Sequence, residues 1–398
     1  MKKKAFKTEI RPSDEQKIKI HQVIGVSRFL YNRYIAYNQE HYERYLEGKE
    51  TFGFVSGMDF DKYVNNELSK QEGFEWIKGV SSKARKQAIM NGEGAFKQLF
   101  KGKAKFPKFK KKRKQDVKAY FPKNNKGDWT IERHRIKIPT IGWVRLKEFG
   151  YIPEGEKASS GTISQKAGRY YVSVLIEVDE NKKKKRKPKE GIGIDLGLKT
   201  FAVFSNGQTY KNINKTKEVR RLEKKLKREQ RSLSRKQEVY KHLKTKGGEP
   251  ATNEYKRKNV QKNVLRVQKL YQRLANIRKE YVRSVVDRCV KTKPTYITIE
   301  DLNVRGMMKN RHLSKAIAGQ NFYAFSSWLK AKCVENDIEL RRVDRFYPSS
   351  KLCSSCGAKK KDLKLKDRVY TCECGNTMDR DKNAALNLLK AKEYAILT

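Results

Sequence analysis

The chain has 398 residues and carries 94 lysines and arginines against 44 aspartates and glutamates, a formal net charge of +50. Such an excess repels itself unless a polyanion neutralises it, so the composition indicates a nucleic-acid partner. The charge is spread along the whole sequence, which favours contact through several domains. No apolar run is long enough to span a bilayer, and the basic N-terminus lacks the apolar core of a secretory signal. We therefore expect a cytoplasmic protein without membrane contact.

The first half of the chain changes from helical to strand-like patterning. Ser13 and Asp14 are typical of a helix start, and apolar residues at helical spacing predict a second helix over about 82–100. From about 105 to 178, short alternating segments separated by Gly, Pro and Asn predict a small β-barrel or curled sheet. The lysine-rich segment 181–190 marks a boundary; a solvated linker explains it most simply, and phosphate contact is compatible with that.

Strands lead into helices after residue 190, which indicates an α/β domain. The pattern predicts an apolar strand at 192–194 and a hairpin through Asn206 and Gly207. Two long basic helices follow, and their apolar faces predict an antiparallel pair. The expected elements of this half are helices at about 216–244 and 252–290, a strand at 296–300, a helix at 314–336, a strand at 338–343, a cysteine-rich segment at 351–376 and a helix at 382–394.

Four cysteines form two close pairs, Cys353 with Cys356 and Cys372 with Cys374. Tetrahedral zinc takes four thiolates, and two paired-cysteine turns, each followed by Gly, present sulfurs in that arrangement. The segment is too short and polar to bury a core, so a structural Zn²⁺ would supply its folding energy. The second pair is Cys-x-Cys, tighter than the common Cys-x-x-Cys. Cys289 and Cys333 lie alone on predicted helices and are interpreted as core residues.

Acidic residues occur where apolar strands end and where the last helix begins. Asp195 and Glu300 each close a strand, and Asp379 and Asp381 open the final helix. Carboxylates from three elements can converge on two Mg²⁺ or Mn²⁺ ions, which would activate water and stabilise a leaving phosphodiester oxygen. Each acid also has a simpler explanation: Asp195 as a turn residue, Glu300 as the partner of a helix lysine, and Asp379 or Asp381 as an N-cap.

Several segments together resemble the TnpB proteins encoded by bacterial insertion sequences. Residues 193–201 (Gly-Ile-Asp-Leu-Gly-Leu-Lys-Thr-Phe) are similar to the first motif of their RuvC-like nuclease domain, and 299–304, with 309–311 and Leu313, to the second. Residues 344–351 resemble the segment that leads into the family's zinc ribbon, and 379–387 (Asp-Arg-Asp-Lys-Asn-Ala-Ala-Leu-Asn) the third motif. Segments 28–32 and 105–110 also match in kind, so the resemblance covers nearly the whole chain.

The resemblance implies a fold of α/β, β-barrel and helical parts: an N-terminal wedge β-barrel interrupted by a helical recognition domain, then an RNase H-like RuvC nuclease domain with an inserted zinc ribbon. The domains expected on this basis are 1–10 as the first strand of the wedge barrel, 11–103 as the helical recognition lobe, 104–180 as the rest of the barrel, 181–190 as a basic linker, 191–345 as the nuclease domain, 346–378 as a zinc ribbon that binds target nucleic acid, and 379–398 as the last part of RuvC.

In activity, the resemblance implies an RNA-guided DNA endonuclease related to type V CRISPR effectors. Its partners would be a guide RNA derived from the transposon end and a double-stranded DNA target with a short adjacent motif, bound by a monomer with one RNA. The motifs carry the catalytic and Mg²⁺-binding roles onto Asp195, Glu300 and Asp381, with Asp379 as a capping or metal-positioning neighbour. The zinc ligands would be Cys353, Cys356, Cys372 and Cys374.

Aromatic residues beside cations suggest where nucleic acid is contacted, because bases stack on aromatic rings. The contacts we expect are Arg28, Tyr31, Lys83, Lys86, Gln87, Asn91, Lys105, Phe106 and Lys108. Core packing is the simpler explanation for any single aromatic among them. Two other functions compete with a nuclease: an RNA-guided repressor that binds DNA without cutting, and a transposase, for which no catalytic tyrosine beside a His-x-His pair is present.

Overall fold

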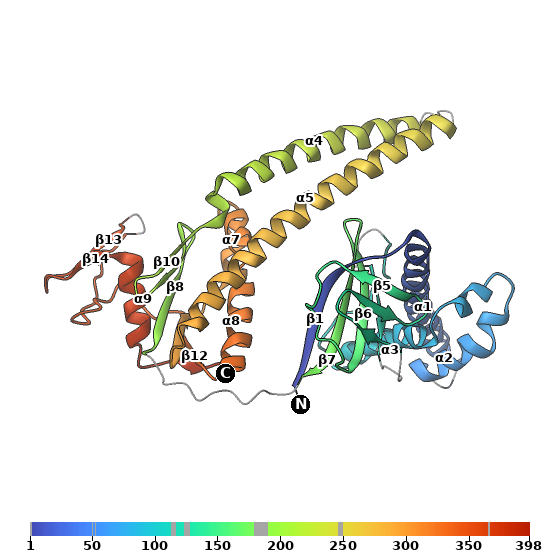
Figure 1. Cartoon of the computed structure of the whole chain (residues 1–398), viewed down its shortest axis with the longest axis horizontal. Coiled ribbons are helices and arrows are strands. Elements are labelled where there is room, and N and C mark those ends of the chain that lie inside the picture. Colours follow the sequence, from blue (N-terminus) through green and yellow to red (C-terminus); the bar gives the residue numbers. More distant parts are fainter. Residues whose placement is uncertain are drawn as a thin grey trace. The chain divides into compact units, whose positions relative to one another are not determined.

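A computed structural model of the chain describes residues 2–49, 51, 53–112, 117–122, 128–178, 190–245, 250–364 and 367–398. The chain divides into two compact units, Met1–Lys183 and Lys184–Thr398, and each is described by itself (Figure 1). Except for Glu190, the predicted linker 181–190 lies outside the described residues. In the described part of the chain, no helix is long and apolar enough to cross a membrane.

The first unit is built on a seven-stranded antiparallel sheet with the order β2-β6-β7-β1-β5-β4-β3. Its strands are β1 (Lys2–Arg11), β2 (Val117–Phe121), β3 (Thr130–Ile131), β4 (Arg135–Ile138), β5 (Gly142–Leu146), β6 (Ala158–Lys166) and β7 (Arg169–Val178). The strand-like patterning predicted from about 105 to 178 is clearest in β7, whose alternate residues Tyr170, Val172, Val174 and Ile176 are buried. The first strand of the chain pairs along β7 in the middle of the sheet.

Among the helices of this unit, the first and third contact strand β2 of the sheet, and the second packs against the third (Figure 1). They are α1 (Asp14–Leu46), α2 (Gly57–Asn66) and α3 (Ser82–Phe100), with 3₁₀ turns η1 (Leu68–Lys70) and η2 (Glu75–Gly79). The predicted helix start is confirmed: the Ser13 hydroxyl accepts the Gln16 backbone N–H, and the Gln16 side chain accepts the Ser13 N–H, a capping box. The fully buried Tyr34 fills the space between α1 and α3, where Gly92 leaves room for its ring.

The second unit is built on a six-stranded mixed sheet with the order β10-β9-β8-β11-β12-β15. Its strands are β8 (Ile192–Leu196), β9 (Thr200–Phe204), β10 (Thr209–Lys211), β11 (Tyr296–Glu300), β12 (Glu339–Val343) and β15 (Ala395–Ile396), and a separate hairpin holds β13 (Val369–Thr371) and β14 (Thr377–Asp379). Strands β8, β11 and β12 are parallel to one another. The predicted hairpin at Asn206 and Gly207 joins β9 to β10, and Gly207 supplies a positive φ of 87°.

The helices of this unit are α4 (Lys217–Thr245), α5 (Pro250–Lys291), α6 (Val304–Met307), α7 (Ser314–Gln320), α8 (Phe322–Asn336) and α9 (Arg380–Lys390), with the 3₁₀ turn η3 (Ile213–Lys215). The prediction of one helix over 314–336 was wrong: Asn321 has a left-handed φ of 57° and separates α7 from α8. The last helix ends at Lys390 rather than 394, because the chain turns at Ala391 and Ile396 pairs with Arg341 of β12.

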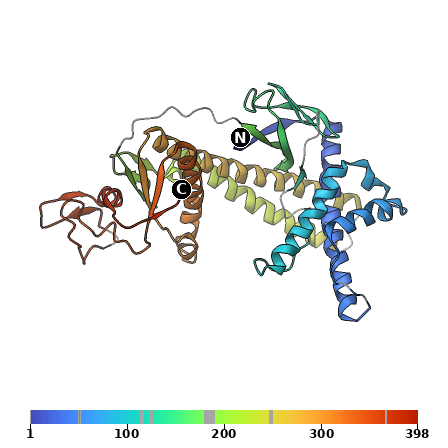
Figure 2. The same cartoon turned by 90° about the horizontal axis from the view of Figure 1, so that it is seen from below.

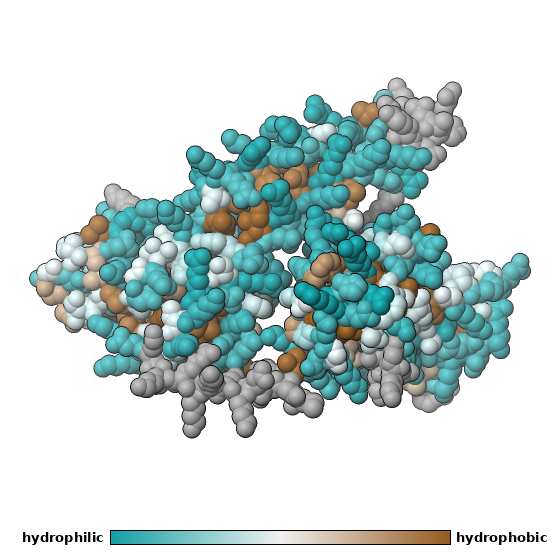
Figure 3. All heavy atoms as spheres, in the orientation of Figure 1, coloured by the Kyte–Doolittle hydropathy of each residue, from teal (hydrophilic) through white to brown (hydrophobic). Residues whose placement is uncertain are grey.

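The two long basic helices form the predicted antiparallel pair. They lie side by side in both Figure 1 and Figure 2 and pack through a strip of apolar residues. The buried members of this strip are Val219, Leu222, Leu226, Val267 and Leu274. An ion pair between Arg278 and Glu223, 2.7 Å long, links the two helices as well. Hydrophilic residues cover most of the visible surface of these helices in Figure 3.

Helices cover both faces of the second sheet. Ile194 and Ile299 point into a core with residues of α5 and α8. On the other face α9 approaches β8 so closely that a Cβ on Gly193 would lie 2.0 Å from the backbone oxygen of Ala385 and 2.5 Å from the Leu389 nitrogen. Only glycine permits this contact, because both obstructing atoms belong to the backbone of a helix and cannot rotate away.

We predict that Gly193→Ala lowers the unfolding free energy by about 3 kcal/mol or more, because α9 must leave β8 to admit the methyl group. Thermal or urea unfolding of the full chain measures this loss. Gly94→Ala is the control: Gly94 lies within helix α3, no atom lies within 4 Å of its added Cβ, and alanine favours the helix. Equal stability of Gly193→Ala and the wild type would contradict the close approach.

Candidate metal sites and a cationic pocket

Asp195 and Glu300 lie side by side on neighbouring parallel strands. Ile194 of β8 pairs with Ile299 of β11, so the residues that follow them, Asp195 and Glu300, are neighbours across the two strands. Adjacent strands are about 4.8 Å apart. Because Ile194 and Ile299 face the core with α5 and α8, the two carboxylates extend from the opposite face, which α9 covers.

Helix α9 brings a third carboxylate to this place. Asp379 caps the helix: its Oδ1 accepts the backbone N–H groups of Asp381 at 2.9 Å and Lys382 at 3.1 Å. The prediction that Asp379 has a capping role is therefore confirmed. The cap fixes the first turn, and Asp381 in that turn interacts electrostatically with Asp195. The structure thus brings together Asp195, Glu300 and Asp381, which are up to 186 positions apart in the sequence.

The surroundings of the three carboxylates disfavour their ionised forms. Burial raises the pKa of Asp195 well above its usual range, and the charges of Glu300 and Asp381 raise it further. Burial also raises the pKa of Glu300, an effect that the hydrogen bond from Ser349 Oγ partly offsets. For Asp381, burial and then Asp379 raise the pKa. Oxygen donors that repel each other in a partly buried place fit a hard divalent cation, whose charge would reverse this penalty.

Two of the simpler explanations for these acids are wrong. Asp195 lies within strand β8, which runs to Leu196, and is not a turn residue. Glu300 accepts its hydrogen bond from Ser349 Oγ, and no lysine pairs with it among the described residues. Ser349 was not predicted as a site residue, because nothing in the sequence indicates a contact that spans 49 residues.

The four cysteines form a compact centre. Their sulfurs all lie within 4.8 Å of one another, with Cys353 to Cys374 and Cys356 to Cys372 both at 3.6 Å. Four thiolates about 2.3 Å from a tetrahedral zinc ion would be roughly 3.8 Å apart, so the donor set fits zinc. Glycines follow both pairs with positive φ, 77° at Gly357 and 83° at Gly375, and turn the backbone around the sulfurs. In the described part of the chain the three carboxylates are not such a compact group.

Hydrogen bonds prepare one of these thiols for a metal. Burial raises the pKa of Cys353, but the backbone N–H groups of Cys356 and Ser355 and the Asn376 side chain lower it to about 6. Cys289 and Cys333, by contrast, are fully buried on α5 and α8, and burial raises the pKa of Cys333 to about 12. The prediction that these two are core residues is confirmed.

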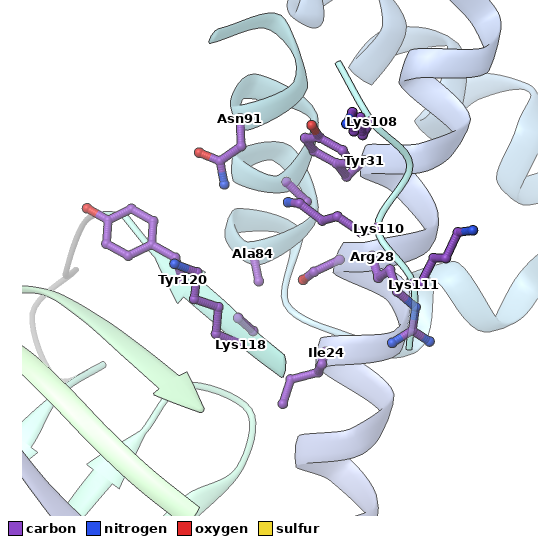
Figure 4. A pocket seen from close by; sticks show the side chains of 13 residues that line it. Ile24, Arg28, Tyr31, Ala84, Asn91, Lys108, Lys110, Lys111, Lys118 and Tyr120 are labelled. Carbon is purple, nitrogen blue, oxygen red and sulfur yellow. The ribbon is translucent and has the colours of Figure 1, made fainter. Parts of the chain in front are cut away.

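The first unit contains a cationic pocket of about 270 Å³ between α1, α3 and β2. Figure 4 shows Asn91 on α3, Arg28 and Tyr31 on α1, and Lys118 and Tyr120 on β2 around it. The residues that line the pocket are Ile24, Ser27, Arg28, Tyr31, Ala84, Ala88, Asn91, Lys108, Lys110, Lys111, Lys118, Ala119 and Tyr120. Five of them are cations and none is an acid, so the pocket suits an anion.

Lys110 is the most constrained cation of the pocket. Its backbone N–H and C=O both bond to the Asn32 amide, at 2.7 and 2.9 Å, and its Nζ lies 3.5 Å from the centroid of the Tyr31 ring. Burial and then the charge of Lys118 lower the pKa of Lys110 to about 8. An anion in the pocket would oppose both effects, because a nearby negative charge stabilises the charged form of Lys110.

The predicted nucleic-acid contacts separate into two groups. Arg28, Tyr31, Asn91 and Lys108 line the pocket. The others have different surroundings: Lys83 forms an ion pair with Asp128 at 2.7 Å, Gln87 donates to Asn91 at 3.0 Å, Phe106 packs edge-on against Phe96, Lys86 lies near Asp61, and Lys105 is exposed. Lys110 and Lys118 were not predicted as contacts, although Lys110 lies in the same basic segment as the predicted Lys105 and Lys108.

Three family models match the chain. They are described as "Probable transposase" over residues 172–311, "Cas12f1-like, TNB domain" over 322–388, and "Helix-turn-helix domain" over 1–47. Over 1–47 this chain has strand β1 followed by the single long helix α1.

Curated relatives and solved structures match nearly the whole chain. A Streptomyces pristinaespiralis protein named "Putative RNA-guided DNA endonuclease" is 30% identical over 399 residues, 98% of this chain and 89% of the relative. "Putative RNA-guided DNA endonuclease InsQ" of Escherichia coli is 28% identical and covers 97% of this chain and 92% of its own. The structure titled "Cryo-EM structure of the Cas12f1-sgRNA-target DNA complex" has a TM-score of 0.55 at 16% identity, over 96% of this chain and 84% of that one.

The structural match defines the class: the chain has the mixed α/β fold of Cas12f1. The sequence matches identify the family within that class, since identity extends over almost the full length of the relatives. The chain belongs to the TnpB family of transposon-associated RNA-guided DNA endonucleases.

We predict that the purified protein carries about one zinc ion per chain and that Cys372→Ser loses most of it, because a tetrahedral site needs all four thiolates. Elemental analysis measures the metal content. Ser355→Ala changes an exposed side chain of the other cysteine turn, between Cys353 and Cys356, and should keep the ion. Unchanged zinc content in Cys372→Ser would contradict the four-cysteine site.

Proposed function

We propose that this chain is an RNA-guided DNA endonuclease that cuts guide-complementary DNA at Asp195, Glu300 and Asp381. The observation that carries the proposal is the convergence of three carboxylates in a chain of net charge +50. A binding protein for nucleic acid needs no such cluster, and the cluster costs stability because burial and the charges of Glu300 and Asp381 raise the pKa of Asp195. The names of its relatives agree with this activity.

Asp195, Glu300 and Asp381 would hold two Mg²⁺ or Mn²⁺ ions. Bound there, the ions would supply an activated water and charge stabilisation for the leaving oxygen of a phosphodiester. The chain itself orients the donors: β8 and β11 hold Asp195 and Glu300 in register, and the Asp379 cap holds Asp381. Arg380 and Lys199, whose charges lower the pKa of Asp381, are placed to attract the phosphate backbone of the strand to be cut.

Guide pairing would leave most sequence reading to base complementarity, so the protein mainly needs cationic surfaces that follow phosphates. The pocket around Lys110 and the basic faces of α4 and α5 provide such surfaces. In this proposal the first unit corresponds to the wedge and recognition domains, and contacts the short motif beside the target. The second unit corresponds to the RuvC-like domain with its zinc ribbon.

The test is cleavage of a matched plasmid by the full chain with its copurified RNA and Mg²⁺. Wild-type protein should linearise the plasmid, and Asp195→Asn should reduce cutting by at least a thousandfold while RNA binding persists, because the acid donates to metal and not to RNA. Asp301→Asn is the matched control, since Asp301 follows Glu300 but pairs with Arg345 at 2.9 Å.

A folding defect would not explain the loss. Asparagine removes a charge from a cluster of like charge, so in EDTA Asp195→Asn should melt no lower than the wild type. Binding of the plasmid without cutting by the wild type would favour the guided repressor. Strand joining at transposon ends without guide RNA would favour the transposase.

The pocket yields a prediction about pH. Because the pKa of Lys110 is lowered to about 8, its charge is present at pH 7 and mostly lost at pH 9. Binding of RNA by the wild type should therefore weaken several-fold more over this range than binding by Lys110→Arg, whose guanidinium stays charged. Filter binding at constant salt measures both. The other titratable or charged groups of the pocket are Arg28, Tyr31, Lys108, Lys111 and Lys118.

Lys111→Arg is the control for this experiment: it makes the same lysine-to-arginine change at another residue that lines the pocket and leaves Lys110 in place, so it should keep the pH profile of the wild type. Identical pH profiles for the wild type and Lys110→Arg would exclude Lys110 from the nucleic-acid contact.

A further inference from the structure

Residues 349–354 connect strand β12 and its following turn to the cysteine centre, and we call this segment the stem. It contains one metal-binding candidate, Cys353, and begins with Ser349. Both ends of the stem are buried: Ser349 is 4% exposed and Ser354 is 6% exposed. Its geometry is therefore set by what packs around it rather than by solvent.

Helix α9 holds the stem through three side chains. Asn387 Nδ2 donates to the carbonyl oxygens of Ser349 and Leu352, both at 2.7 Å. Asn383 Nδ2 donates to Leu352 O at 2.6 Å, while its Oδ1 accepts the Ser354 N–H at 3.0 Å. Lys390 Nζ donates to Ser354 O at 2.6 Å. These residues recur along one face of α9, at intervals of four and three.

The stem in turn contacts the carboxylate cluster. Ser349 Oγ donates a hydrogen bond to Glu300 Oε1. The Ser349 backbone has little freedom, because its N–H bonds to Tyr347 O at 2.8 Å and its carbonyl accepts from Asn387. The hydroxyl therefore approaches Glu300 from a fixed position. Helix α9 thus determines two things at the cluster: the place of Asp381 and, through the stem, the donor to Glu300.

We propose that Ser349 is a positioning residue that holds the Glu300 carboxylate in the orientation needed to bind a divalent cation. A free glutamate has three rotatable side-chain bonds, and repulsion from Asp195 would turn this one away from the cluster. The Ser349 bond occupies one oxygen and leaves the other available to a metal. This role rests on the proposed function of the acids and adds to it, since it gives the stem of the cysteine centre a part in metal binding.

The test is Mn²⁺ affinity, measured by electron paramagnetic resonance on the purified full chain without DNA. Ser349→Ala should bind Mn²⁺ about tenfold more weakly, as is typical when a partner of a metal ligand is lost. Ser349→Thr keeps the hydroxyl and should recover most of the affinity. Ser350→Ala is the matched control, because Ser350 Oγ lies 3.5 Å from Arg380 Nη2 and not against Glu300.

The outcomes separate this proposal from the proposed function. Zinc content and melting temperature should be the same in Ser349→Ala and the wild type, so that a purely structural defect is recognised. If Ser349→Ala binds Mn²⁺ as the wild type does while Asp195→Asn does not bind it, the acids hold metal and the role of Ser349 is refuted. If Asp195→Asn also binds as the wild type does, the metal site itself is refuted.

Discussion

The contact between α9 and β8 at Gly193 is the constraint on which the second unit depends. Backbone meets backbone there, with no side chain between the strand and the helix. This closeness places the first turn of α9 beside Asp195, and it directs Asn383 and Asn387 at the stem of the cysteine centre. Helix α9 therefore contacts the carboxylates, the stem and the core, so a displacement of α9 would disturb all three.

The carboxylate cluster has the opposite charge to that of the chain as a whole. The chain has a net charge of +50, which suits phosphates, yet acids are gathered at the point where β8, β11 and α9 meet. In the absence of a cation this gathering is unfavourable, because burial and mutual repulsion both disfavour ionisation. Clusters of groups with such strongly shifted pKa values are typical of active sites, where the chemistry needs them although they lower stability. The Lys110 pocket is the opposite case, because its cations repel one another and an anion bound there would stabilise them.

Local signals allowed accurate prediction where the physical cause is local. The cap at Ser13, the helix over 82–100 and the turn at Gly207 each follow from the chemistry of a few adjacent residues. The errors occurred where distant contacts decide. Apolar spacing runs through 314–336 without interruption, but the left-handed Asn321 divides the helix. The last helix ends at Lys390 because the chain leaves it to pair with β12.

By itself the sequence determined the chemical groups: four cysteines spaced for one metal, acids at the ends of strands and at the start of a helix, and a strong positive charge. It determined these because residue type and spacing along the chain are covalent properties. Only the tertiary structure decided which groups meet. Three contacts join residues that are far apart in the sequence: the hydrogen bond from Ser349 to Glu300, the hydrogen bonds from Asn387 to the stem, and the packing around Lys110. Such contacts arise from packing of whole elements, and no local pattern of residues encodes them.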